Sequence, residues 1–168
     1  SAASDVYKRQ LYKQSILPGF QWHMSIASGC KPLMLFLIPE PARAPHSSLA
    51  HMAGCIQDNL AAENSVFAVK PNSNGEWILD ITATLQCLNS ACALSQPMLV
   101  LGTAFSFVHL LEFLTENNIE MRLPNGSAVM ETGGYKGRSR EMPREELHAK
   151  LNCLLGVSRS HIICEYGM

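Results

Sequence analysis

Short apolar runs that alternate with longer amphipathic segments constrain the fold of this chain more than any other feature. The clearest run is Leu-Met-Leu-Phe-Leu-Ile at residues 33–38, and Pro39 closes it. A continuous apolar run of this length is typical of a strand that is buried on both faces of a parallel sheet. Further strands are predicted at residues 65–69, 98–101 and 127–130, and in a short segment that runs into Glu165.

The segments between these strands carry apolar residues at helical spacing. Helices are predicted at residues 46–60, 77–94, 103–117 and from about Pro143 to Gly156. Ser47 or Ser48 can cap the first helix, Thr103 can cap the third, and Gly156 can end the last. Strands that alternate with helices of ten or more residues imply right-handed crossovers. The sequence therefore predicts an α/β fold with a mainly parallel, doubly wound sheet.

Composition excludes several classes of partner. The 168 residues are 47% hydrophobic and 16% charged, which suits one globular domain. The 13 basic and 14 acidic residues give a net charge of −1, so no overall field favours nucleic acid. The longest apolar run is six residues, whereas a membrane span needs about 20. We expect no nucleic-acid partner and no membrane span.

The cysteines and histidines do not suggest a metal site or a disulfide framework. The six cysteines are scattered and form no CxxC pair, so they are interpreted as reduced, buried thiols of a cytoplasmic protein. His46 and His51 lie near the start of a predicted helix without a third ligand close in sequence. His109 is interpreted as a core or groove residue. The sequence thus predicts no metal ligands.

The two ends of the chain differ in character from its middle. Residues 1–10 (SAASDVYKRQ) resemble translated sequencing-adapter sequence, so they are predicted to be an artefactual leader without core contacts. Residues 11–32 show no clean period and are left unassigned or as loop. The folded domain is predicted over residues 33–168. Its last strand runs into Tyr166, Gly167 and Met168, which suggests a piece of a longer protein, incomplete at both ends.

A glycine turn at Gly133 and Gly134 is the strongest candidate for a binding site. Adjacent glycines let a flat ring or a phosphate lie directly against the backbone, which a Cβ would prevent. Ligands of doubly wound sheets bind beyond the carboxyl ends of the strands. We therefore predict that three strand ends, at Gly102, Gly133 and Tyr166, meet at one edge of the sheet.

Four motifs in order resemble the adenylate-forming (ANL) superfamily. They are LVLGTAFSFVHLLEFL, METGGYKG, PREELHAKLNCLLGV and EYGM, between residues 98 and 168. The Gly-Gly-Tyr-Lys-Gly turn, the following Met-Pro-Arg-Glu-Glu-Leu and the upstream LFLIPEPARAPHSSLAHM are most similar to the acyl-protein synthetases of the bacterial bioluminescence (LuxE) family. Phenylacetate-CoA ligases are near relatives. The resemblance covers residues 33–168.

The resemblance implies an N-terminal domain that uses ATP and Mg²⁺ to activate a fatty acid as acyl-AMP, for transfer to a thiol of a partner protein. It implies a nucleotide site in two parts. The adenine and α-phosphate side would be lined by Thr132, Gly133, Gly134 and Tyr135. The base and ribose side would be lined by Glu165, Tyr166, Gly167 and Met168. Lys136 either contacts phosphate or belongs to a solvated basic loop.

Several parts of the family pattern are absent from the 168 residues. The family has a Ser/Thr/Gly-rich phosphate loop before this region, a Thr-Glu after the position of Met168, and a C-terminal lid domain with a catalytic lysine and an acyl-accepting cysteine. No catalytic residue is therefore assigned here, none of the six cysteines is nominated for acyl transfer, and this polypeptide by itself is expected to be inactive. Two alternatives stay open: a fragment similar to phenylacetate- or acyl-CoA ligases, and a non-catalytic Rossmann-like binding module. The chain has no G-x-G-x-x-G motif after any predicted strand, which weakens the second alternative.

Overall fold

The computed structural model describes residues 10, 14–15, 17–22, 24, 31–133 and 142–165. Six strands form one sheet in the order β3-β2-β1-β4-β5-β6. The strands are β1 (Leu33–Pro39), β2 (Val66–Pro71), β3 (Trp77–Leu79), β4 (Met98–Thr103), β5 (Ala128–Thr132) and β6 (Ile162–Glu165). Neighbouring strands are parallel, except that β3 runs antiparallel to β2. The helical elements are α2 (Ser48–Leu60), α3 (Ile81–Ala93), α4 (Ala104–Glu116), α5 (Arg144–Leu155) and the 3-10 turn η1 (Arg159–His161).

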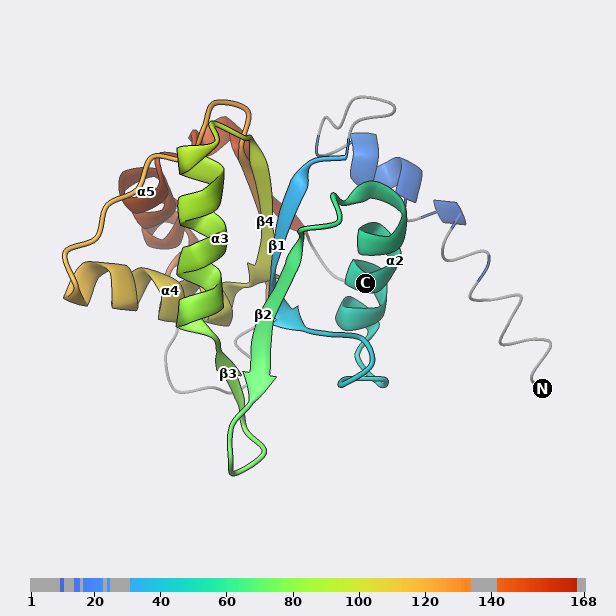
Figure 1. Cartoon of the computed structure of the whole chain (residues 1–168). Coiled ribbons are helices and arrows are strands. Elements are labelled where there is room, and N and C mark those ends of the chain that lie inside the picture. Colours follow the sequence, from blue (N-terminus) through green and yellow to red (C-terminus); the bar gives the residue numbers. More distant parts are fainter. Residues whose placement is uncertain are drawn as a thin grey trace.

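Helices cover both faces of the sheet. Figure 1 shows α2 on one side and α3, α4 and α5 on the other. The connections from β1 lead through α2 to β2, whereas the chain reaches β4 and β5 through α3 and α4. The predicted α/β fold with a mainly parallel, doubly wound sheet is confirmed.

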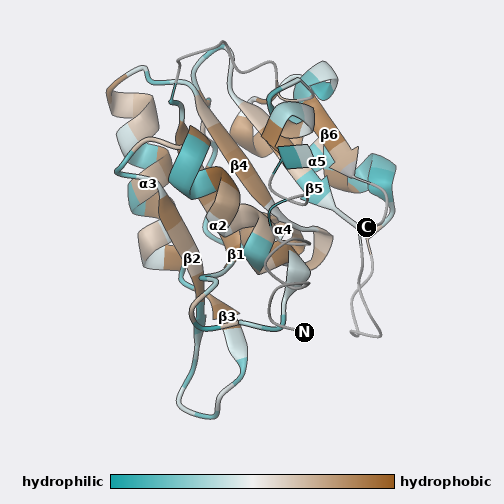
Figure 2. Cartoon of the chain, turned by 90° about the vertical axis from the view of Figure 1, so that its right-hand side faces the viewer, coloured by the Kyte–Doolittle hydropathy of each residue, from teal (hydrophilic) through white to brown (hydrophobic). Residues whose placement is uncertain are grey.

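The central strand β1 contributes to both hydrophobic cores. Leu33, Leu35 and Leu37 belong to the core under α3, α4 and α5, and the intervening residues belong to the core under α2. This division follows from the period of two in a strand, whose successive side chains point to opposite faces. Figure 2 shows that the strands are hydrophobic along most of their length, as burial on both faces requires.

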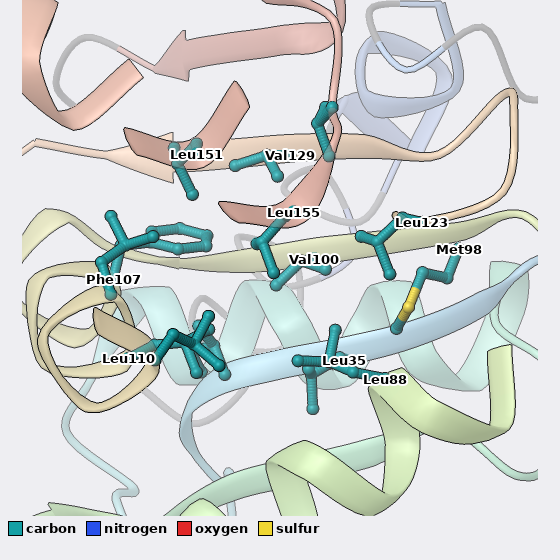
Figure 3. Packing of buried hydrophobic residues seen from close by; sticks show 14 of the residues in the cluster. Leu35, Leu88, Met98, Val100, Phe107, Leu110, Leu123, Val129, Leu151 and Leu155 are labelled. Carbon is teal, nitrogen blue, oxygen red and sulfur yellow. The ribbon is translucent and has the colours of Figure 1, made fainter. Parts of the chain in front are cut away.

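The larger core lies between the sheet and the three helices. Val100 on β4 and Val129 on β5 are fully buried there, beneath Phe107 of α4 and Leu151 of α5 (Figure 3). On the opposite face, the rings of Phe36 and Phe67 stack with their centroids 4.6 Å apart and join β1 to β2.

Polar caps begin three of the helices. The side chains of Ser47, Asp80 and Thr103 accept hydrogen bonds from the backbone N–H groups of residues 50, 83 and 106. Such caps satisfy N–H groups that have no partner inside the helix. Gly156 ends α5 with φ of 68°, a left-handed conformation that glycine adopts without steric cost. The predicted caps at Ser47 and Thr103 and the predicted stop at Gly156 are confirmed.

The prediction of a helix over residues 77–94 is wrong at its start. Residues Trp77–Leu79 form the edge strand β3, and the helix begins only after Asp80. The turn at Asn72 to Gly75 folds the chain into a hairpin, in which Leu79 pairs with Val69. Ile78 lies at helical spacing from Ile81, so the apolar pattern alone could not separate the two elements.

Residues 11–32, for which the sequence predicts no regular element or a loop, contain helical structure. Residues 17–22 are helical, and Phe20 and Met24 are buried against the core under α2. Of the predicted artefactual leader only Gln10 is described, and it is exposed. Residues 1–9 lie outside the described part of the chain.

The cysteines in the described part are free thiols. Cys55 and Cys87 are buried as predicted, whereas Cys153 is exposed on α5. Burial raises the pKa of the Cys87 thiol to about 11, so this side chain stays protonated at neutral pH.

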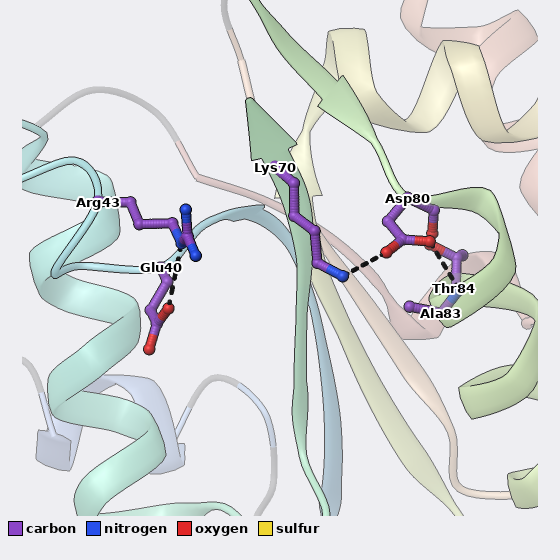
Figure 4. A network of polar contacts seen from close by, with 6 residues as sticks. All are labelled: Glu40, Arg43, Lys70, Asp80, Ala83 and Thr84. Atoms are coloured by element: carbon purple, nitrogen blue, oxygen red, sulfur yellow. Dashed lines mark hydrogen bonds and ion pairs between the residues drawn. The ribbon is translucent and has the colours of Figure 1, made fainter. Parts of the chain in front are cut away.

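Asp80 couples the hairpin to the start of α3. Its carboxylate accepts from the Ala83 N–H and from the Lys70 ammonium group of β2 (Figure 4). The hydrogen bond from Ala83 and then the bond from Lys70 lower the pKa of Asp80 below its ordinary value of 3.8. Because the pKa is lower in the folded state, ionised Asp80 stabilises the fold above pH 3.8, and this contribution is lost as the pH falls through the folded-state pKa.

We expect the Asp80→Ala variant to lose about 1 kcal/mol of unfolding free energy near neutral pH, since an N-cap is removed. The difference from the wild type should shrink as the pH falls below 3.8 and through the lowered folded-state pKa, because the wild-type carboxylate then becomes protonated. Urea unfolding followed by circular dichroism, repeated at several pH values, measures both effects.

Ser47→Ala is the matched control, because it removes an N-cap that does not titrate. Its loss of about 1 kcal/mol should be the same at each pH. If the loss of unfolding free energy in the Asp80→Ala variant did not depend on pH, the charge of Asp80 would not contribute to stability.

Candidate functional site

The carboxyl ends of β4, β5 and β6 lie side by side at one edge of the sheet. Thr103 is paired in register with Thr132, and Thr132 with Glu165. The predicted meeting of these strand ends is thus confirmed as far as Glu165, and Tyr166 lies outside the described residues. Gly102 is the penultimate residue of β4, so this strand extends two residues beyond its predicted end at residue 101.

A groove with a volume of about 1340 Å³ opens beside this edge. Its walls come from the end of β1, the start of α2, the β3 hairpin, the flank of α4 and the end of β5. The groove lies where β1 and β4 are neighbours and their following helices, α2 and α4, leave toward opposite faces. Doubly wound sheets bind ligands at this topological switch point.

The groove has a polar end and an apolar side. The N-termini of α2 and α4 begin at it, with Ser47 and Thr103 as their caps, and helix N-termini favour negative charge. The apolar side includes Trp77 and Ile78 of the hairpin. Phe105 of α4 lines it too, and packs edge-on against another lining residue, His109, with ring centroids 4.4 Å apart. His109 is exposed, so its interpretation as a groove residue is correct.

The predicted site residues divide into those that are described and those that are not. Thr132 and Gly133 line the groove. Glu165 is the register partner of Thr132 on the neighbouring strand β6, so its backbone lies at the same edge of the sheet. The other predicted nucleotide and phosphate contacts lie outside the described residues: Gly134, Tyr135, Lys136, Tyr166, Gly167 and Met168.

Two glycines at this edge have different physical roles. A Cβ on Gly102 would lie 2.8 Å from the Leu37 Cβ and 3.3 Å from a ring atom of Phe107, so Gly102 permits close packing of β4 against β1. A Cβ on Gly133 would meet no atom within 4 Å among the described residues. Packing against the described residues therefore does not require a glycine at position 133, and these residues leave its backbone open to a ligand.

We expect Gly102→Ala to lower the unfolding free energy by about 1 to 3 kcal/mol, the usual cost of overpacking a core. Gly133→Ala should change it by less than about 0.5 kcal/mol, as surface substitutions usually do. Thermal and urea unfolding of the two variants compare them directly. Equal losses would contradict the different roles of the two glycines.

A second polar cluster lies on the α5 face of the sheet, one residue before the predicted nucleotide contacts. Cys164 Sγ is 2.6 Å from Glu131 Oε1 and 3.4 Å from His148 Nε2. His148 Nε2 is 3.5 Å from the same Glu131 oxygen. Glu131 is only 3% exposed, and Arg144 Nε approaches its Oε1 at 3.8 Å. Burial and then the neighbouring Glu131 carboxylate raise the pKa of the Cys164 thiol to about 12.

Sequence reasoning missed this cluster. Glu131 lies in a motif whose glycines are the predicted ligand contacts, and Cys164 is one of the six scattered cysteines that the sequence predicts to be buried thiols. The three residues form no short ligand motif such as CxxC or HxxxH. The period of two in β5 was the one available signal, because a glutamate between Met130 and Thr132 in an apolar strand must face a partner or an ion.

Comparisons with protein-family models, with curated proteins and with solved structures give no match. Within the described residues, none of the helices has the length and apolar character needed to cross a membrane.

Proposed function

We propose that this chain forms the nucleotide-facing wall of an ATP-dependent ligase that activates a fatty acid as acyl-AMP for transfer to a protein thiol. The observation that carries the proposal is the alignment of Thr103, Thr132 and Glu165 at the ends of three adjacent parallel strands. The resemblance to acyl-protein synthetases rests on the motifs that follow these same strands.

Gly133 supports nucleotide binding at this edge. Its backbone follows Thr132 directly, is exposed, and borders the groove with space above it. A base or a phosphate can therefore approach the peptide groups closely, as glycine turns at strand ends allow. The nearby start of α4 adds a favourable field for phosphate.

The shape and lining of the groove support a second, apolar substrate. Its volume of about 1340 Å³ exceeds the roughly 300 to 1,000 Å³ of most small-molecule pockets. Trp77, Ile78 and Phe105 offer apolar surface to an acyl chain, and Ile78 remains 48% exposed. The carboxyl head of such an acid can lie near the polar end of the groove, close to Thr103 and Thr132.

ATP with Mg²⁺ would supply the activated α-phosphate and the pyrophosphate leaving group. The described residues fit the base and phosphates, through Gly133 and the capped helix starts, and Mg²⁺ is usually held largely by the phosphates themselves. The contribution of this wall is to orient the two substrates and to exclude water between them. Holding two reactants in line can supply about 7 to 11 kcal/mol of barrier lowering.

A CoA ligase would use the same wall, because adenylation precedes the choice of thiol. A different class of function is favoured by the strand order. Without the antiparallel hairpin strand β3, the five parallel strands follow the 2-1-3-4-5 order of flavodoxin-like folds, which bind a nucleotide at the switch point. A nucleotide-binding module without catalysis is therefore the second candidate. Catalytic turnover is expected of a ligase and not of a binding module, so its measurement separates the two classes.

The test is exchange of labelled pyrophosphate into ATP, in the presence of fatty acids, by protein expressed from the complete reading frame. We expect exchange that depends on the acid and is about 100-fold weaker in Gly133→Ala, since a misplacement of about 1 Å costs that much. Gly19→Ala is the matched control, because it also adds a Cβ in open space but lies away from the groove.

The remaining outcomes distinguish the candidates. ATP binding that Gly133→Ala weakens, without exchange for any carboxylic acid tried, would favour the binding module and refute the ligase. Acyl transfer to CoA instead of a protein thiol would assign the CoA ligase. Neither ATP binding nor exchange in a folded protein would contradict both candidates.

A further inference from the structure

We propose that Glu131, His148 and Cys164 form a binding site for one divalent transition-metal ion of the zinc type. The site does not depend on the proposed ligase activity. It combines residues of β5, α5 and β6, and it lies on the face of the sheet that α5 covers.

The three donor atoms converge on one point. Tetrahedral zinc with bonds of about 2.0 to 2.3 Å places its ligands roughly 3.3 to 3.7 Å from one another. The distances from His148 Nε2 to Cys164 Sγ and to Glu131 Oε1 are 3.4 and 3.5 Å, within that range. The 2.6 Å between Cys164 Sγ and Glu131 Oε1 is shorter, so these two side chains must separate by about 1 Å around an ion.

The arrangement differs from a cysteine nucleophile with a histidine base. In such a triad the acid contacts the histidine nitrogen that is remote from the nucleophile, and thereby orients the ring. Here Glu131 and Cys164 both approach the same atom, Nε2 of His148. Three donor atoms that surround one point have the arrangement expected of ligands in a metal coordination site.

The identity of the donors selects the class of ion. A thiolate and an imidazole suit zinc and its neighbours in the first transition series, whereas Mg²⁺ and Ca²⁺ prefer oxygen ligands. Three protein ligands with one remaining position is the usual pattern of a zinc site that is open to water or substrate. On binding the ion, the Cys164 thiol would release its proton to solvent, and the resulting thiolate and the Glu131 carboxylate together would balance the charge of one divalent ion.

The scaffold holds the ligands rigidly. Glu131 and Cys164 are register partners on adjacent parallel strands. His148 lies on α5 between Leu147 and Leu151, which are buried in the core. Such support reduces the cost of organising a first coordination shell. Because Thr132 follows Glu131 and Glu165 follows Cys164, an ion here would also brace the strand ends of the candidate nucleotide site.

The test is titration of Co²⁺ into the untagged, metal-free 168-residue chain under a non-thiol reductant, followed by absorption spectroscopy. We expect one Co²⁺ per chain with a thiolate-to-cobalt charge-transfer band, and competition by Zn²⁺. Cys164→Ser should abolish the band, and His148→Gln should weaken affinity by more than the roughly 10- to 100-fold that changes behind a metal ligand cost.

Cys153→Ser is the matched control, because Cys153 is an exposed thiol on the same helix as His148. It should keep the band and the affinity. Arg144→Gln should bind Co²⁺ at least as tightly as the wild type, since this substitution removes a cation that competes for Glu131.

Circular dichroism of each metal-free variant checks folding, and the partly exposed His148 provides a second test if Cys164→Ser does not fold. Absence of a charge-transfer band in the folded wild type would overturn the proposal. A band that survives Cys164→Ser, or that Cys153→Ser removes, would overturn it too.

Discussion

Burial of β1 on both faces is the constraint on which the rest of the structure depends. Leu35, Phe36 and Leu37 are completely shielded from solvent, and alternate residues of this strand enter two different cores. A strand of this kind needs helices on each side of the sheet. The chain meets this need by sending α2 to one face and α3, α4 and α5 to the other. The groove opens where these two directions diverge, so its position follows from how β1 is buried.

The period of two in β5 lets the same strand end serve two different sites. Thr132 borders the groove, and the preceding Glu131 contacts residues on α5 and β6. Adjacent residues of a strand point to opposite faces, so the two sets of side chains do not compete for space. The candidate nucleotide site and the proposed metal site can therefore share one rigid support, and an ion bound to Glu131 would limit movement of the strand end beside Gly133.

Local signals explain why most elements were predictable. Ser47, Thr103 and Gly156 act on backbone groups within their own turn, so their effect is readable from neighbouring residues. The strand at Trp77–Leu79 was mistaken for helix because its identity comes from pairing with β2. The helical residues 17–22 were missed because burial of Phe20 and Met24 depends on a core made by distant parts of the chain.

The sequence by itself determined the α/β class, the order of most elements and the strand ends that meet at one edge of the sheet, because periodicity and capping are local. It also placed Thr132 and Gly133 at such an end. Only the tertiary structure decided that Gly102 serves packing, that Gly133 has no such role among the described residues, and that Cys164 meets Glu131 and His148. Cys164 is separated from these two partners by 33 and 16 positions, so their contact is set by strand register and by the docking of α5, which no local pattern specifies.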